Sequence, residues 1–271
     1  MGTVSYTDAA AYKAYVEEFA GELMSIMYHS SPTAQSATPH EGLKGKLVLT
    51  ELVLGQLARR WNKAFNPVDD LIDFQPRVLD VERCKIELQF VPQEFESSYL
   101  GEYRRLGQNA DDLPFEGYIM QKVFAKFAEE KEIAMWQAAA AGAPAENDPM
   151  TDVFDGLLEI IADEITATNL TPVATPTGAW TAGNIISTLE TMYDGLDDAV
   201  KEGMSEVYMS YSLYQLYNQA YRDTYGKYVS MNEEGRVKLD FGNCYLKPVP
   251  GLNGSDRVAI MPVGNIHYGY D

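Results

Sequence analysis

The chain of 271 residues contains 40 acidic and 21 basic residues, giving a formal net charge of −19, and 46% of its residues are hydrophobic. This length is sufficient to bury a substantial core, and the composition is typical of folded globular proteins. An acidic surface repels phosphate backbones, so the charge argues against sequence-specific binding of nucleic acid. The sequence contains no run near the roughly 18 apolar residues of a membrane helix, which argues against a membrane-spanning role.

The first part of the chain is predicted to contain two helices separated by a polar segment. Residues 7–28 place apolar and aromatic residues at helical spacing, and the pattern is not that of a signal peptide, so secretion by that route is not expected. The segment "HSSPTAQSATPHEG", at 29–42, contains two prolines and is expected to be a hinge or a mobile arm. The stretch "GKLVLTELVLGQLARRWNKAF", at 45–65, favours a second helix that ends at Asn66 and Pro67.

Residues 68–110 are predicted to form an extended hairpin loop. Ile86, Leu88 and Phe90 alternate with polar residues, which is the period-two pattern of a strand with one solvent-exposed face. The region has many charges and few large apolar residues, so a hairpin here cannot form a core alone. It is expected to lie on another surface, and a neighbouring subunit is one candidate.

The next region is predicted to contain the longest helix of the chain. This helix runs from Pro114 to Ala141, because acidic residues precede Pro114 and Gly142 suits the position after its end. A shorter helix follows, with Asp148 as its cap and Pro149 in its first turn. Its buried face is expected to consist of Val153, Phe154, Leu157, Leu158 and Ile161.

The last part of the chain combines two helices with short strands. Thr181 is predicted to cap one helix, and a second helix is capped by Ser210 and ended by Gly226. A short strand, "EVYMS", precedes Ser210. Four closing strands separated by turn residues are predicted at "RVKLDF", "CYLKPV", "RVAIMP" and "NIHYGY". The fold class is therefore α+β, with helices and antiparallel strands in separate blocks.

The search for catalytic chemistry is largely negative. The sequence contains no Walker, Rossmann, nucleophile-elbow or zinc-protease motif. His29, His40 and His267 are scattered, and scattered histidines are more typical of surface or core positions than of a metal site. Cys84 and Cys244 are far apart and are expected to be ordinary buried thiols. The sequence therefore assigns no catalytic, cofactor-binding or metal-binding residue.

Two acidic clusters keep a metal-dependent hydrolase open as an alternative function. The clusters are Asp69, Asp70 and Asp73, and Asp148, Asp152 and Asp155. Neither has the spacing of an EF-hand loop. Carboxylates in a first helical turn are also favoured by the helix dipole alone, so a role without a metal is the favoured interpretation of the second cluster.

The order of these parts resembles the major capsid proteins of tailed bacteriophages, whose Hong Kong-type capsid fold is shared with bacterial encapsulin shells. The resemblance covers about residues 70–271 and consists of the charged hairpin loop, the long helix beginning "DLPFEGYIM" and the later helices. Its most specific part is the closing segment "KPVPGLNGSDRVAIMPVGN". The similarity is one of arrangement with short loose motifs.

This resemblance implies a structural protein without catalytic turnover. Its copies are expected to assemble as hexamers and pentamers into the icosahedral head shell around double-stranded DNA, in the host cytoplasm and then in the virion. Scaffolding, portal or decoration proteins are further possible partners. The implied regions are an N-terminal arm with helices (1–67), the extended hairpin loop (68–110), a peripheral domain with the long helix as its spine (111–170) and an axial domain (171–271).

The residues expected to make subunit contacts lie in the hairpin loop and in the axial loop. They are Ile86, Leu88, Phe90, Phe95 and Tyr99 in the hairpin, and Pro250, Leu252 and Asn253 in the axial loop. Lys85 lies in the loop where some relatives form a covalent cross-link, but no partner asparagine is matched, so that chemistry is not carried over.

One alternative function stays open within the same fold. An encapsulin-like compartment would enclose enzymes instead of DNA.

The chain departs from the family at its last strand. Family members usually continue beyond the strand that corresponds to "NIHYGYD". The lineage is therefore either unusually short, or the chain is a truncated or processed form, and the second is the favoured expectation.

Overall fold

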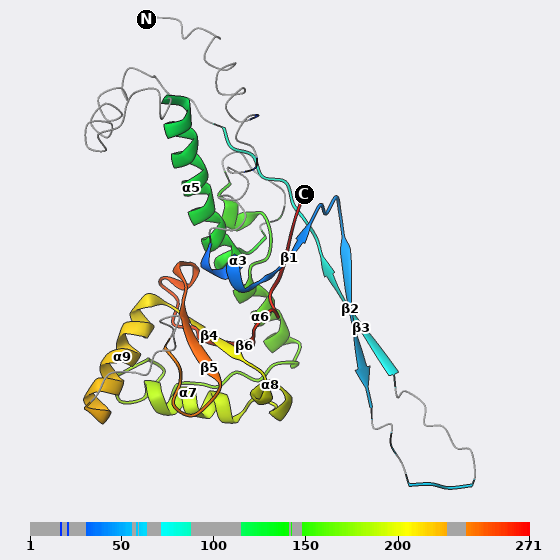
Figure 1. Ribbon diagram of the computed structural model, residues 1–271, viewed down its shortest axis with the longest axis vertical. Coiled ribbons are helices and arrows are strands. Elements are labelled where there is room, and N and C mark those ends of the chain that lie inside the picture. Colours follow the sequence, from blue (N-terminus) through cyan, green and yellow to red (C-terminus); the bar gives the residue numbers. More distant parts are fainter. Residues whose placement is uncertain are drawn as a thin grey trace, which may run out of the picture.

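The protein is described from a computed structural model, in which residues 17, 21, 31–55, 58, 60–63, 72–87, 115–140, 142, 148–226 and 237–271 are placed. These residues form a body of helices and short strands and a two-stranded hairpin that projects from it (Figure 1). The elements are α3 (Pro32–Ser36), β1 (Thr38–Glu41), β2 (Leu47–Leu54), β3 (Ile72–Leu79), α5 (Phe115–Gln137), η1 (Met150–Asp152), α6 (Leu157–Thr166), α7 (Ile185–Asp194), α8 (Asp198–Glu202), β4 (Ser205–Met209), α9 (Tyr211–Tyr225), β5 (Cys244–Pro248), η2 (Pro250–Leu252), β6 (Ala259–Pro262) and β7 (His267–Tyr270). This mixed content is compatible with an α+β fold.

The helices with strong local signals form where the sequence predicts them. The long helix α5 covers 115–137 of the predicted 114–141. Helix α9 begins at Ser210, whose hydroxyl accepts a hydrogen bond from the Leu213 amide, and it ends at Gly226 with a φ of 65°. This left-handed conformation is the one that glycine adopts without steric cost.

Two predicted helix starts are wrong by several residues. Helix α6 begins after Gly156 instead of at Asp148 and Pro149, and a short 3₁₀ turn takes the earlier position. Gly156 packs against the end of α5, where an added Cβ would lie 2.8 Å from the Ala134 carbonyl oxygen. Helix α7 has Asn184 as its N-cap instead of the predicted Thr181.

A three-stranded sheet with the order β5-β4-β6 forms the centre of the body. β4 pairs with β6 in the antiparallel sense but with β5 in the parallel sense, so the prediction of purely antiparallel strands is wrong. The parallel pair arises because α9 lies between β4 and β5 in the chain and provides the crossover that parallel strands need. The predicted strand "RVKLDF" is reduced to a bridge between Lys238 and Tyr245.

The two faces of β4 belong to two hydrophobic clusters. Val207 and Met209 pack into a cluster with residues of α7, α9 and β5. Tyr208 packs on the opposite face with Trp136 of α5 and Leu252 of η2, and the Trp136 and Tyr208 ring centroids are 5.3 Å apart. Because every residue of β4 is buried, this strand holds the two halves of the body together.

The polar segment predicted as a hinge or mobile arm is instead part of the body. Thr33 is fully buried in α3, and β1 pairs in parallel with β7, the strand closest to residue 271. Figure 1 shows these two strands side by side between the body and the hairpin. We call residues 31–41 the polar strap.

The projecting hairpin consists of β2 and β3, which pair in the antiparallel sense from Leu47–Leu79 to Leu54–Ile72. The predicted helix over 45–65 is therefore wrong for residues 47–54. These residues alternate between two faces of a ribbon, and the β-branched residues Val48 and Thr50 suit a strand. The hairpin begins earlier in the chain than the predicted 68–110, and residues 80–87 have no regular secondary structure, so Ile86 does not lie in a strand.

Candidate functional site

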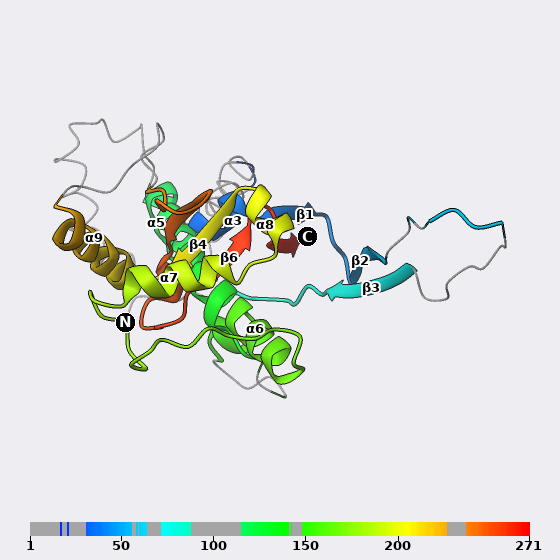
Figure 2. The same cartoon turned by 90° about the horizontal axis from the view of Figure 1, so that it is seen from below.

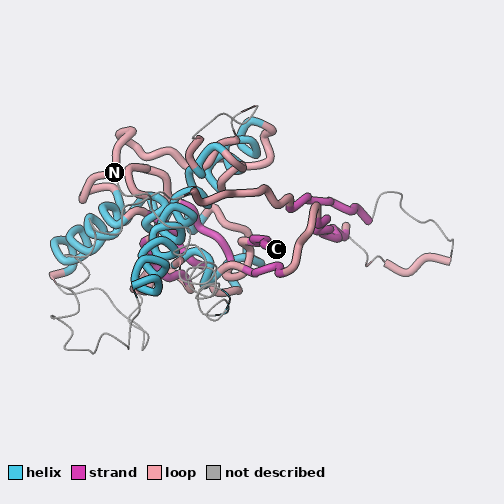
Figure 3. Tube along the Cα trace, turned by 90° about the horizontal axis from the view of Figure 1, so that it is seen from above, coloured by secondary structure: helices cyan, strands magenta, loops and turns pink. Residues whose placement is uncertain are grey.

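The most prominent functional candidate is one face of the β2–β3 hairpin. Figures 2 and 3 show the hairpin leaving the body and extending beyond it as a narrow ribbon. In an antiparallel pair, residues that lie directly opposite each other share a face. The register therefore assigns each side chain of the ribbon to one of two faces.

One face of this ribbon is almost entirely apolar. The opposed pairs on this face are Val48–Val78, Thr50–Pro76, Leu52–Phe74 and Leu54–Ile72. The six large apolar side chains among them are between 49% and 63% exposed. We call this surface the apolar hairpin face.

The opposite face of the hairpin is more polar and carries the contacts that orient the ribbon. It presents Glu51 opposite Gln75, and Leu49 opposite Arg77. The Arg77 guanidinium forms an ion pair with the Glu164 carboxylate of α6. A hydrogen bond from the Asn169 amide and the charge of Arg77 together lower the pKa of Glu164. This pair connects the hairpin to α6 of the body.

Further contacts fix the base of the hairpin. Lys46 Nζ lies 2.9 Å from Asp80 Oδ2, which closes the ribbon just outside the two strands. Leu79 lies close to Gly269 of β7, where an added Cβ would be 3.2 Å from the Leu79 side chain and would collide with Leu43. A glycine at this position therefore lets the hairpin base approach the last strand.

The apolar hairpin face has the physical character of a binding surface. Exposed apolar area of this kind is unfavourable in water, and contiguous patches mark interaction sites in most soluble proteins. Covering the exposed half of one such side chain contributes on the order of 1 kcal/mol. Six side chains on one ribbon therefore provide several kcal/mol of driving force for association with another surface.

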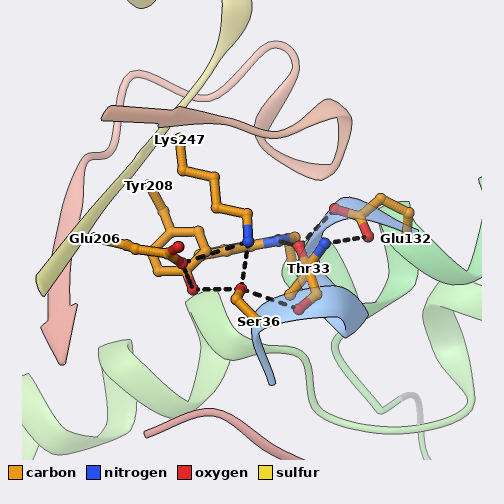
Figure 4. A network of polar contacts seen from close by, with 7 residues as sticks. Thr33, Ser36, Glu132, Glu206, Tyr208 and Lys247 are labelled. Carbon is orange, nitrogen blue, oxygen red and sulfur yellow. Dashed lines mark hydrogen bonds and ion pairs between the residues drawn. The ribbon is translucent and has the colours of Figure 1, made fainter. Parts of the chain in front are cut away.

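A buried polar network forms the second candidate site (Figure 4). At one end of this network, both oxygens of the Glu132 carboxylate on α5 accept hydrogen bonds from Thr33 of the polar strap. The hydroxyl lies 2.5 Å from Oε1 and the amide nitrogen 3.2 Å from Oε2. The Trp136 indole donates to the same hydroxyl at 2.8 Å. Burial raises the pKa of Glu132, and the Thr33 hydrogen bonds oppose that shift.

The other end of the network joins the strap to the central sheet. The Tyr208 hydroxyl lies 2.7 Å from Glu206 Oε2 and 2.9 Å from the Ser36 hydroxyl. Lys247 of β5 hydrogen-bonds Ser36 and lies 3.3 Å from Glu206 Oε2. Burial raises the pKa of the Tyr208 hydroxyl, so this group stays protonated.

This network is suited to holding elements together and not to nucleophilic catalysis. A serine beside a lysine is a pattern used for acyl transfer, but the lysine must then be neutral to act as a base. Here Lys247 is instead engaged in an ion pair with Glu206, which is 2% exposed. The network therefore fastens the polar strap to α5 and to the sheet at the same time.

The residues that the sequence assigns to subunit contacts differ in exposure, and some of them lie outside the described residues. Ile86 is exposed, whereas Leu88, Phe90, Phe95 and Tyr99 lie outside the described residues. Asn253 is exposed and Pro250 is half-buried. Leu252 is 1% exposed in the core around Trp136, so its side chain packs within its own chain and is not available to a neighbour.

Three acidic residues of the alternative hydrolase site accept local hydrogen bonds, and Asp148 is exposed. Asp155 accepts a hydrogen bond from the Ala140 amide, and Asp152 accepts one from the Thr151 hydroxyl. Asp73 lies in β3 and is hydrogen-bonded by Gln75. Asp69 and Asp70 lie outside the described residues. Across the described ranges, no group of three or more histidine, cysteine, aspartate or glutamate side chains gathers as a metal site.

The two cysteines differ from the sequence prediction. Cys244 is buried in the core, and burial raises the pKa of its thiol to about 11, so it is unreactive. Cys84 is exposed, which contradicts the expectation of two buried thiols, because it follows β3 in a stretch without regular structure.

Sequence reasoning missed the apolar hairpin face because it assigned β2 to a helix. The segment "LVLTELVL" has apolar residues on both predicted faces, so its sequence alone does not distinguish a strand from a helix. A comparison with known proteins finds neither a matching family model nor a matching curated sequence. Among the helices of the described ranges, none is both long and apolar enough to cross a bilayer.

Proposed function

We propose that the protein is a shell subunit, the major capsid protein of a tailed bacteriophage, whose copies assemble into an icosahedral shell around double-stranded DNA. The observation that supports this most strongly is the apolar hairpin face. A protein that acts alone gains nothing from a ribbon that holds six large apolar side chains in water. A subunit that must bind a neighbouring subunit needs such a surface.

The chain order and the charge agree with this proposal. The projecting hairpin comes first, the long helix α5 follows, and the helices and strands of the closing part complete the body. This is the order in which the resemblance to tailed-phage capsid proteins places the hairpin loop, the spine helix and the axial domain. The net charge of −19 suits a protein shell that does not bind the DNA that it encloses.

The buried polar network supports the same function from inside the subunit. A ribbon that binds a neighbouring subunit holds the two subunits in place only if the base of the ribbon is well packed on its own subunit. The polar strap continues into the hairpin through residues 42–46, and its anchors on α5 and on the sheet are 99 and 172 residues away in sequence. The base of the hairpin is thus connected through the strap to α5 and to the central sheet.

The test is the oligomeric state of the purified chain and of two matched double variants. Leu52→Lys with Phe74→Lys places two charges opposite each other on the apolar hairpin face. Glu51→Lys with Gln75→Lys places two charges opposite each other on the polar face of the same strands, so both variants carry the same cross-strand repulsion. Size exclusion with light scattering, followed by electron microscopy, then reports assembly.

We expect the wild-type chain and the Glu51/Gln75 variant to form closed particles, rings or sheets, and the Leu52/Phe74 variant to stay small. Equal assembly of both variants would refute the role of the apolar hairpin face. The contents of closed particles distinguish the encapsulin-like alternative, because packaged enzyme instead of DNA would identify a compartment shell.

A further inference from the structure

Two of the three histidines in the chain come together at the junction of β1 and β7. His40 Nε2 lies 2.9 Å from His267 Nδ1, although the residues are 227 positions apart in the sequence. The ring centroids are 5.2 Å apart with 27° between their planes, so the rings meet end to end through these two nitrogens. His267 is exposed and His40 is half-buried, so solvent reaches the pair.

The parallel pairing of β1 with β7 explains why these rings meet. The register opposes Thr38 to His267 and His40 to Gly269, so both histidines lie on one face as diagonal neighbours. Gly269 has no side chain that could stand between the two rings.

Backbone and side-chain contacts hold this junction at both ends. The Thr38 amide donates to the Ile266 carbonyl at 2.7 Å, and the Thr38 hydroxyl donates to the Gly264 carbonyl at 2.9 Å. At the other end, the Tyr270 hydroxyl donates to Glu41 Oε1 at 2.7 Å. The two imidazoles are therefore brought together by the fold before any ligand arrives.

We propose that His40 and His267 form a two-histidine site for a divalent transition metal of the Zn²⁺ class, with water in the remaining coordination positions. Imidazole nitrogen is a preferred ligand for Zn²⁺, Cu²⁺ and Ni²⁺, whereas Mg²⁺ and Ca²⁺ prefer oxygen. This inference does not depend on the proposed shell function.

Both the spacing and the orientation of the rings must change to accept the metal. Two nitrogens bound to a tetrahedral Zn²⁺ at 2.0–2.1 Å are separated by about 3.3 Å, so the observed pair has to open by about 0.4 Å, and the rings have to turn about their side-chain bonds until both nitrogens point at the metal. The ring that now donates the hydrogen bond moves its proton to its other nitrogen, and both facing nitrogens then present lone pairs.

A metal at this position would cross-link the two strands. It would join the polar strap, near the beginning of the described chain, to the strand closest to residue 271. Because the unfolded chain does not hold the two histidines together, metal binding is expected to stabilise the folded state.

The test uses the chain without a polyhistidine tag, ZnCl₂ as the probe and MgCl₂ as the control salt. Isothermal titration calorimetry gives the affinity, and thermal unfolding gives the shift in melting temperature. Wild type is compared with His40→Gln and His267→Gln, which keep a polar side chain of similar size. His29→Gln serves as the control for the loss of one histidine, and circular dichroism confirms that each variant is folded.

We expect one saturable Zn²⁺ site in wild type and in His29→Gln, and loss of that site in His40→Gln and His267→Gln. At a free Zn²⁺ concentration a hundredfold above the Kd, the melting temperature should rise by roughly 5–10 °C in wild type and not in the two site variants. MgCl₂ should have no comparable effect. Wild-type protein without saturable binding, or equal Zn²⁺ binding in folded His40→Gln or His267→Gln protein, would overturn the proposal.

Discussion

The polar strap and the β2–β3 hairpin are close in sequence but have opposite environments. The strap is rich in serine, threonine and proline, yet Ser31, Thr33, Ala34 and Ala37 are buried. The first hairpin strand, "LVLTELVL", is largely apolar, yet Val48, Leu52 and Leu54 are about half exposed. Burial in this chain therefore follows the available partners and not the hydrophobicity of the segment.

The difference in burial between the strap and the hairpin follows from the partners that each segment meets. Thr33 and Ser36 of the strap are accommodated because Glu132, Trp136, Tyr208 and Lys247 offer hydrogen-bond partners for their polar groups. A buried polar group without such partners would be costly. The hairpin is exposed because the described body provides no matching apolar surface for it, which leaves its apolar face for another molecule.

The largest expected effect comes from breaking the ion pair under the strap. Lys247→Met keeps the length of the side chain but leaves Glu206, which is 2% exposed, without the adjacent positive charge. Removing one partner of a buried pair costs about 3–5 kcal/mol, so the free energy of unfolding should fall by that order. Urea unfolding followed by tryptophan fluorescence measures it. A loss below about 1 kcal/mol would show that the network does not hold the strap.

A smaller effect is expected where the strap meets α5. Thr33→Val keeps the shape of the side chain but removes the hydroxyl that binds Glu132 and Trp136. The expected loss is about 1–3 kcal/mol, because two buried polar groups lose a partner. Ser36→Ala, at the sheet end of the strap, is the matched comparison, since Ser36 is only partly buried. A Thr33→Val variant as stable as wild type would contradict the role assigned to this contact.

The smallest effect is a pH dependence that involves Glu132. Burial raises the pKa of this carboxyl above its ordinary value of 4.5, so the folded state binds its proton more tightly than the unfolded state does. The contribution of Glu132 to the free energy of unfolding is therefore fully present below pH 4.5, and it is lost as the pH rises through the raised pKa. The difference in unfolding free energy between wild type and Glu132→Gln should fall across that window. A difference that rises with pH would contradict the direction of the shift.

The sequence predicts a helix or strand correctly where its formation depends on residues that are close by in the chain. Helix α9 is marked by Ser210 at its start and Gly226 at its end, and α5 by the acidic residues before Pro114 and by its length. These signals act within one or two turns and do not depend on the rest of the fold. Strand β4 forms at the predicted segment "EVYMS".

The sequence was not sufficient where distant residues decide the outcome. Thr33 is buried because of Glu132, 99 positions away, and the His40–His267 contact joins residues 227 positions apart. Strand β2 has apolar residues at spacings that fit a helix and a strand equally well, and only its pairing with β3 decides between them. The parallel sense of β4 and β5 likewise depends on the crossover through α9.

The most direct test of the central claim is the particle mass of the Leu52→Lys/Phe74→Lys variant beside that of the Glu51→Lys/Gln75→Lys variant. Both changes lie on the projecting ribbon, so both proteins should keep the helical far-UV signal of the wild-type body. The proposed function predicts small species for the first variant and assembled particles for the second. Assembled particles from the Leu52/Phe74 variant would contradict it, because the apolar hairpin face would then not be needed for association.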